Sequence, residues 1–158
     1  MCCLALLAGQ IEDAGNHLRR LLAFCYQTDE YNQARAGDAL KYLVGSQADE
    51  KVSDSVLGVA FAYACYLATA RHFQLNLRGF ELLRLFLAHD SYQNSAAMIM
   101  CDAYYGQSPR VKKEIVDSIK LIAAFDEGLA ALLRDKVMHD STTTVVAYLK
   151  RCEEEAAE

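Results

Sequence analysis

The amino-acid sequence predicts an all-α protein, a compact bundle of about eight helices around a central hydrophobic hairpin. One proline and eight glycines in 158 residues favour helices over a turn-rich β fold. Apolar residues recur at three- and four-residue steps, and no segment alternates at period two. Two apolar runs, 56–70 and 80–88, lie on either side of a short polar turn. They predict two helices that are buried on most sides and form the hairpin.

The first two helices and a connector are expected within the first 54 residues. One long helix is predicted over residues 4–25 because its apolar residues form a single stripe. That stripe consists of Leu4, Leu7, Ile11, Ala14, Leu18, Leu21 and Cys25. Thr28 is expected to cap the second helix, which ends near Gly45, and the polar segment 46–54 is expected to be a connector.

The central hairpin and the later helices follow from capping signals. Ser53 or Asp54 is expected to begin the third helix, which extends to about His72, and Asn76 is expected to cap the fourth. The fifth helix is expected to end at Gly106. The remaining predicted N-caps are Asp90 or Ser91, Ser108 (followed by Pro109), Asp126 and Ser141.

Size and composition limit the classes of protein. The length predicts a single domain, 1–158, that can bury a core without disulfides or metals. With 53% apolar and 23% charged residues, the chain is expected to fold rather than stay disordered. The net charge of -5 argues against nucleic acid as a partner, because nucleic acid favours a basic face.

Six cysteines are present, but disulfides are not expected. The start Met1-Cys2-Cys3-Leu4 lacks the basic region of a secretory signal. Three further cysteines lie inside helical patterns, where a free thiol behaves as a small apolar side chain: Cys25, Cys65 and Cys101. A reducing, cytoplasmic location is therefore predicted. Cys2 and Cys3 are either acylation sites or ordinary thiols.

A membrane anchor, a metal site and catalysis are not expected. The run 56–70 is shorter than the roughly 20 residues that a spanning helix needs, and the chain ends in acidic residues. The four histidines have no partner at zinc-ligand spacing. No phosphate-binding loop or serine-nucleophile motif is present. We therefore expect no cofactor and no enzymatic activity.

Three segments resemble motifs of the Bcl-2 family, and they occur in that family's order. Ala36-Gly37-Asp38-Ala39-Leu40 resembles the core of a BH3 helix. Asn76-Leu77-Arg78-Gly79 resembles the BH1 signature Asn-Trp-Gly-Arg with its last two residues exchanged. Asp126-Glu127-Gly128-Leu129 falls where BH2 would lie. Because both motif tryptophans are replaced by leucines and no membrane tail follows, the chain is most similar to the virus-encoded members.

The resemblance implies a protein that blocks cell death by sequestering the BH3 helices of pro-apoptotic proteins. The ligand helix would lie in a groove between the second, third and fourth helices. The implied groove residues are Leu40, Val44, Tyr66, Ala70, Arg78 and Gly79. Arg78 would pair with the aspartate of the ligand, or Gly79 would take its place in the groove. Ordinary core packing is the alternative for the four apolar wall residues, and a solvated charge is the alternative for Arg78.

A second functional class stays open. The segment Gly79-Phe80-Glu81-Leu82-Leu83 is similar to part of the second helix of a tetratricopeptide unit. That similarity implies a helical-repeat scaffold for protein–protein interaction, although no other segment repeats the pattern at that period. The sequence leaves the choice of BH3 ligand and the formation of a homodimer open.

Overall fold

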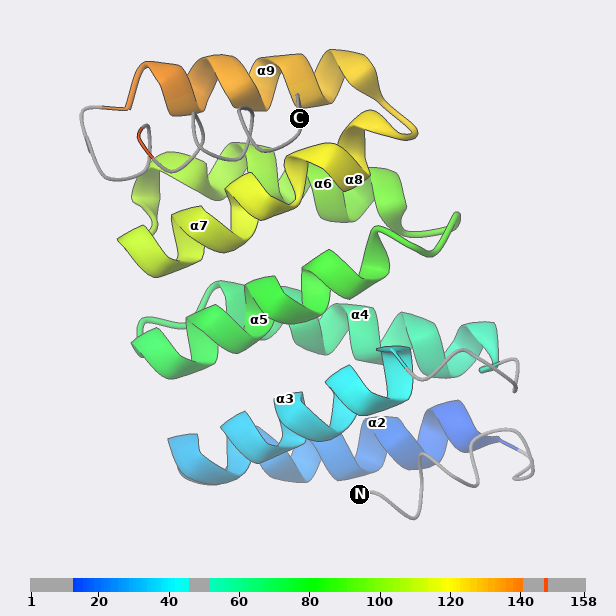
Figure 1. Cartoon of the computed structure of the whole chain (residues 1–158). Helices are drawn as coiled ribbons and strands as arrows, with labels where there is room; N and C mark the ends of the chain where they lie inside the picture. The colour runs from blue at the N-terminus through cyan, green and yellow to red at the C-terminus, as the bar shows by residue number, and fades with distance from the viewer. Residues whose placement is uncertain (1–12, 46–51, 141–146, 148–158) are drawn as a thin grey trace. The chain divides into compact units, whose positions relative to one another are not determined.

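The computed structural model describes residues 13–45, 52–140 and 147, and all regular structure in these ranges is helical (Figure 1). The prediction of an all-α helical bundle is confirmed. The helices are α2 (Ala14–Cys25), α3 (Glu30–Gly45), α4 (Asp54–Ala68), α5 (Phe73–Phe86), α6 (Gln93–Ala103), the 3-10 helix η1 (Tyr104–Gly106), α7 (Pro109–Asp117), α8 (Ile119–Ala123) and α9 (Glu127–Met138).

The chain divides into two compact units, Met1–Phe86 and Leu87–Glu158. Each unit is described by itself below. A single domain over 1–158 stays a prediction.

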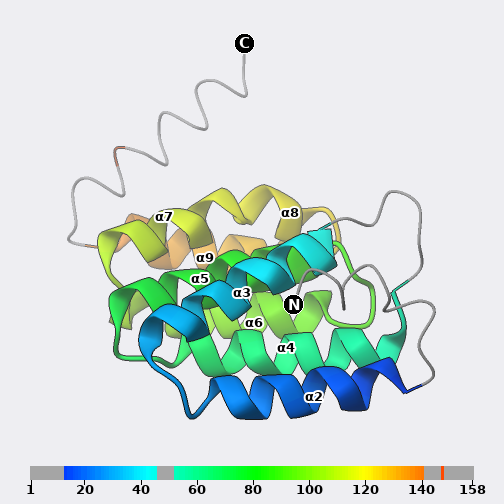
Figure 2. The ribbon, with the colours of Figure 1, turned by 90° about the horizontal axis from the view of Figure 1, so that it is seen from below.

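The first unit contains two helix pairs, α2/α3 and α4/α5. Figures 1 and 2 show α2 and α4 running in one direction and α3 and α5 in the opposite direction. Helix α2 packs against α4, α3 packs against α5, and α4 and α5 contact each other along their length. The second pair therefore stacks on the first, with equivalent helices side by side. The α4/α5 hairpin supplies fully buried side chains such as Tyr63, Leu67 and Phe80.

Helix α2 begins later than predicted. Asp13 has a left-handed backbone (φ 66°), so a helix does not run through it from residue 4 to residue 25. Residues 4–12 lie outside the described ranges. The buried face of α2 consists of Ala14, Gly15, Leu18 and Leu22. A Cβ atom at Gly15 would lie 2.8 Å from the Ser55 Cβ, so α2 and α4 approach closely at this end.

The start of α3 is capped by Asp29, and the prediction of Thr28 as its cap is wrong. The Asn32 backbone N–H donates to Asp29 Oδ1 over 2.9 Å. The Thr28 hydroxyl instead donates to the Cys25 carbonyl at the end of α2, over 2.7 Å. The predicted end at Gly45 is confirmed.

The turn between α4 and α5 also differs from the prediction. Ser53 is the N-cap of α4, as expected, but α4 ends at Ala68 rather than near His72. Helix α5 begins at Phe73, so Asn76 lies inside its first turn and is not its cap. The Asn76 side-chain amide donates to the Ala68 carbonyl over 2.6 Å. It thus satisfies one of the carbonyls that the end of α4 leaves without a helical partner.

The second unit contains α6, η1, α7, α8 and α9. The predicted caps Ser108 and Asp126 are confirmed, since each accepts a hydrogen bond from the backbone three residues later. Between the predicted caps Ser108 and Asp126 the chain forms two helices, α7 and α8, which are divided at residue 118. The buried Ser118 donates its hydroxyl to the Glu114 carbonyl over 2.8 Å, and such bonds often bend helices. The predicted cap Ser141 lies outside the described residues.

A buried ion pair joins η1, α7 and the end of α9 in this unit. Lys112 Nζ lies 2.7 Å from Asp140 Oδ2, and the side chains are 9% and 5% exposed. The Tyr104 hydroxyl donates to the same carboxylate oxygen over 2.9 Å. Burial raises the pKa of Tyr104 above its usual range, and the hydrogen bond to Asp140 raises it further.

Candidate functional site

The residues implied by the resemblance occupy different environments in the first unit. Leu40 and Val44 are each 1% exposed on α3 and contribute to the core. Tyr66 is 37% exposed on α4 and Ala70, just after that helix, is half-buried. Leu40 and Val44 therefore present almost no apolar surface to solvent. Their role in ligand binding stays a prediction.

Arg78 and Gly79 are neighbours in α5, but they face different helices. Arg78 faces α3, where its Nε lies 2.8 Å from Asp38 Oδ1. This contact is an ion pair without a hydrogen bond, and Nε is buried without a hydrogen-bond partner among the described residues. Gly79 faces α4, where a Cβ atom would lie 2.6 Å from the Ala68 Cα.

The Asp38–Arg78 contact belongs to a network of four charges between α3 and α5. Lys41 Nζ lies 2.6 Å from Glu81 Oε2 and 3.3 Å from Asp38 Oδ1. The Arg78 guanidinium lies 3.3 Å from the same Glu81 oxygen. The four side chains are between 21% and 48% exposed, so solvent screens the network. Asp38, in the BH3-like segment, thus pairs with the BH1-like arginine of the same chain.

A cluster of three tyrosines joins α2 and α4 near the turn into α3. The Tyr26 ring stacks edge-on against Tyr66 at 4.4 Å and lies 5.3 Å from the Tyr63 ring. The Tyr63 hydroxyl donates to the Gln33 carbonyl, and the Tyr66 hydroxyl donates to Gln33 Oε1, each over 3.3 Å. Burial is the main cause that raises the pKa values of Tyr63 and Tyr26. The three tyrosines act here as packing and hydrogen-bonding groups.

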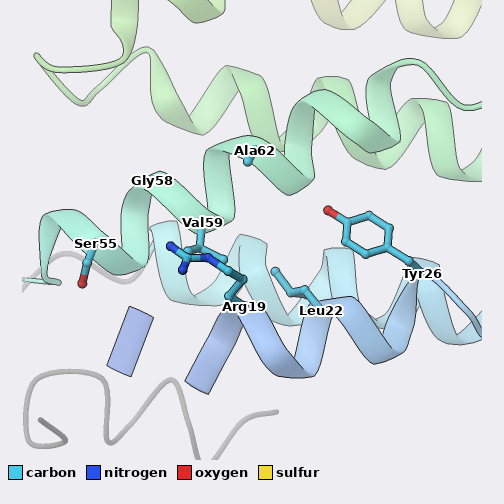
Figure 3. A pocket seen from close by; sticks show the side chains of 7 residues that line it. All are labelled: Arg19, Leu22, Tyr26, Ser55, Gly58, Val59 and Ala62. Carbon is cyan, nitrogen blue, oxygen red and sulfur yellow. The ribbon is translucent and has the colours of Figure 1, made fainter. Parts of the chain in front are cut away.

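Beside the tyrosines, a hollow of about 370 Å³ lies between α2 and α4. Its lining is Arg19, Leu22, Tyr26, Ser55, Gly58, Val59 and Ala62. In Figure 3 the side chains of Arg19 and Leu22 on α2, and of Tyr26 just after it, project toward α4, whose four residues form the opposite side. The lining combines apolar groups with one guanidinium and two hydroxyls. None of these residues was singled out as a binding residue from the sequence.

Metal-ligand groups, thiols and membrane-spanning helices can be assessed among the described residues. Within ranges 13–45 and 52–140, no group of three or more His, Cys, Asp or Glu side chains is placed to hold a metal ion. The described thiols of Cys25 and Cys65 have pKa values raised by burial, which lowers their reactivity. Among the helices described, none is long and apolar enough to cross a membrane.

Comparison with known proteins gives no assignment. No protein-family model, no curated protein sequence and no solved structure matches this chain.

Proposed function

We propose that this protein is a helical-repeat scaffold that binds other proteins and has no catalytic activity. The stacking of α4/α5 on α2/α3, with equivalent helices side by side, is the observation that supports the proposal most. Stacked helix pairs are the architecture of repeat proteins, whose extended surfaces serve as binding sites. A contiguous surface of neighbouring helices is suited to a protein partner rather than to a small substrate.

The spacing of the pairs helps to place the scaffold among repeat types. Helices α2 and α4 begin 40 residues apart, at Ala14 and Asp54, and α3 and α5 begin 43 residues apart, at Glu30 and Phe73. These spacings exceed the roughly 34-residue tetratricopeptide period and fall within the roughly 40–47 residues of HEAT-type repeats. The proposed scaffold is therefore of the longer helix-pair kind.

A binding selection tests this function. The full chain is immobilised and used to select from a displayed library of random protein segments of about 40 residues, a length that spans one or two helices. We expect enriched segments that bind the folded chain with a Kd of about 10 µM or tighter, or about -7 kcal/mol. Failure of every segment in a saturated library to reach that affinity would refute the scaffold function.

A second candidate function, capture of pro-apoptotic BH3 helices, is favoured by the Asp38–Arg78 contact. The resemblance implies that Arg78 pairs with the aspartate of a bound BH3 helix. In this chain Asp38, from the BH3-like segment itself, lies 2.8 Å from Arg78. An external BH3 helix would therefore compete with an internal one.

Titration with a panel of BH3 peptides tests this candidate. Asp38→Ala should raise the peptide affinity because it leaves Arg78 free of its α3 partner. Arg78→Ala should lower the affinity by roughly 2–5 kcal/mol, since the ligand aspartate is left unpaired. Tyr42→Ala, at a position on α3 that is 62% exposed, is the control. If no peptide binds any variant below roughly 1 µM, or about -8 kcal/mol, this function is abandoned.

A further inference from the structure

The hollow between α2 and α4 has the shape of a short groove parallel to both helices. Arg19, Leu22 and Tyr26 follow each other at three- and four-residue steps, so they lie on one face of α2. Ser55, Gly58 or Val59, and Ala62 do the same on α4. Because α2 and α4 run in the same direction, the two stripes lie alongside each other (Figure 3).

The dimensions of the groove match two turns of a helix. Each stripe covers seven residue steps, which is about 10 Å at 1.5 Å per residue. Side chains at i, i+3 or i+4, and i+7 of an incoming helix cover the same distance. The side chains on the α4 side of the groove are small, because Gly58 has no side chain and the exposed Ala62 has a single methyl group. A partner helix can therefore approach this side closely.

The charge at the groove indicates which charged residue a partner would carry. Among the described residues that line the groove, Arg19 is the single charged one. Its NH1 donates to Asn16 Oδ1 over 2.7 Å, and no carboxylate among the described residues pairs with it. The hydroxyls of Tyr26 and Ser55 lie in the same lining and can also donate hydrogen bonds. The groove thus presents hydrogen-bond donors and the positive charge of Arg19 next to apolar surface.

The geometry points to this groove as a docking site for an amphipathic helix of a partner protein. The helix would place apolar side chains at i, i+3 or i+4, and i+7 over the exposed Tyr26 and Ala62 and the half-buried Val59, and an aspartate or glutamate against Arg19. This inference rests on the proposed scaffold function and names the class of partner. None of the residues that line this groove belongs to the BH3-binding residues implied by the family resemblance.

The test uses the full chain and the segments enriched by the binding selection. We expect the enriched segments to share the apolar spacing and an acidic residue at one edge. Ala62→Gln fills the groove and Arg19→Glu reverses its charge, so each should weaken binding at least tenfold, or about 1.4 kcal/mol. The matched controls are Ala23→Gln and Arg20→Glu, which change exposed residues of α2 outside the lining. They should leave the affinity unchanged.

A charge exchange separates docking from a general loss of structure. A segment whose acidic residue is replaced by lysine should bind Arg19→Glu more tightly than it binds the wild-type chain. Unchanged helical circular dichroism of all variants would show that they are folded.

Three results would overturn the groove assignment. Segments that bind Ala62→Gln and Arg19→Glu as tightly as wild type would place docking elsewhere and leave the scaffold function standing. Absence of any binding segment would remove both the groove and the function. A dimer in sedimentation that Ala62→Gln dissociates would mean that a second copy of the chain, rather than a partner helix, occupies the groove.

Discussion

Replacement of Gly79 by alanine is the sharpest probe of the α4/α5 hairpin. A Cβ atom at this position would clash with the Ala68 backbone nitrogen and would lie 2.6 Å from the Ala68 Cα and 2.7 Å from the Leu67 carbonyl carbon. Ordinary contacts of a Cβ atom begin at 3.4 Å. Since the atoms in conflict belong to the backbone, rotation of a side chain does not relieve the clash. The two helices must move apart by about 1 Å to admit the methyl group.

Two opposing effects determine how much of the free energy of unfolding the Gly79→Ala protein loses. Overpacking a core costs about 1–3 kcal/mol, and we take the upper end because backbone must move. Alanine is favoured over glycine inside a helix by about 1 kcal/mol. The Gly79→Ala protein should therefore lose about 2 kcal/mol of its free energy of unfolding.

Two other glycines of the same unit provide graded controls. At Gly45 a Cβ atom would lie 3.7 Å from the Leu85 Cδ1 and 3.9 Å from its Cδ2, which are ordinary contacts. At Gly37 it would meet the flexible end of Leu67 at 3.0 Å. We expect Gly45→Ala to keep or raise the stability and Gly37→Ala to fall between the other two.

Urea unfolding followed by circular dichroism measures these differences, since the chain has no tryptophan for fluorescence. If Gly79→Ala is as stable as Gly45→Ala, α4 and α5 do not approach as closely as described, and the reasoning fails.

Three further predictions concern the buried polar groups. Asp140→Asn should cost about 3–5 kcal/mol in urea unfolding because Lys112 keeps a buried charge without its carboxylate, and a loss below 1 kcal/mol would contradict this. The pKa of Tyr63 is higher in the folded state than its value of about 10 in the unfolded state. The difference contributes to the free energy of unfolding in full below pH 10, and this contribution is lost as the pH rises above 10. Thermal melts of Tyr63→Phe should therefore show a smaller decline above pH 10 than wild type, and an equal decline would count against it. Asn76→Ala should cost about 1 kcal/mol because the Ala68 carbonyl loses its hydrogen bond, whereas unchanged urea stability would show that water replaces the amide fully.

The helices were largely predictable from local signals, and the errors have physical causes. Ser108 with Pro109, and Asp126, act within one helical turn, so sequence alone located both caps. Asn76 has the side chain of a cap, but it caps the preceding helix because the turn brings the Ala68 carbonyl within 2.6 Å. That contact depends on the path of the chain between two helices, which a local pattern does not contain.

The site was less predictable than the helices. An apolar run such as 56–70 predicts burial on most sides, yet Ala62 within this run is exposed on α4. Small residues at positions 55, 58 and 62 were the available signal, because they follow one face of the helix. The pairing of that face with Arg19 and Tyr26 depends on how α2 stacks on α4. Likewise, the sequence did not show that Asp38 would pair with Arg78 of its own chain.

Amide chemical-shift mapping tests the central claim, a protein-binding scaffold whose α2/α4 groove accepts a partner helix. The full chain is labelled with ¹⁵N and titrated with the tightest enriched segment that carries an acidic residue. The account predicts that the largest shifts fall in residues 19–26 and 55–62, on the two sides of the groove. Saturable shifts confined to other parts of the chain, with these two stretches unaffected, would contradict it.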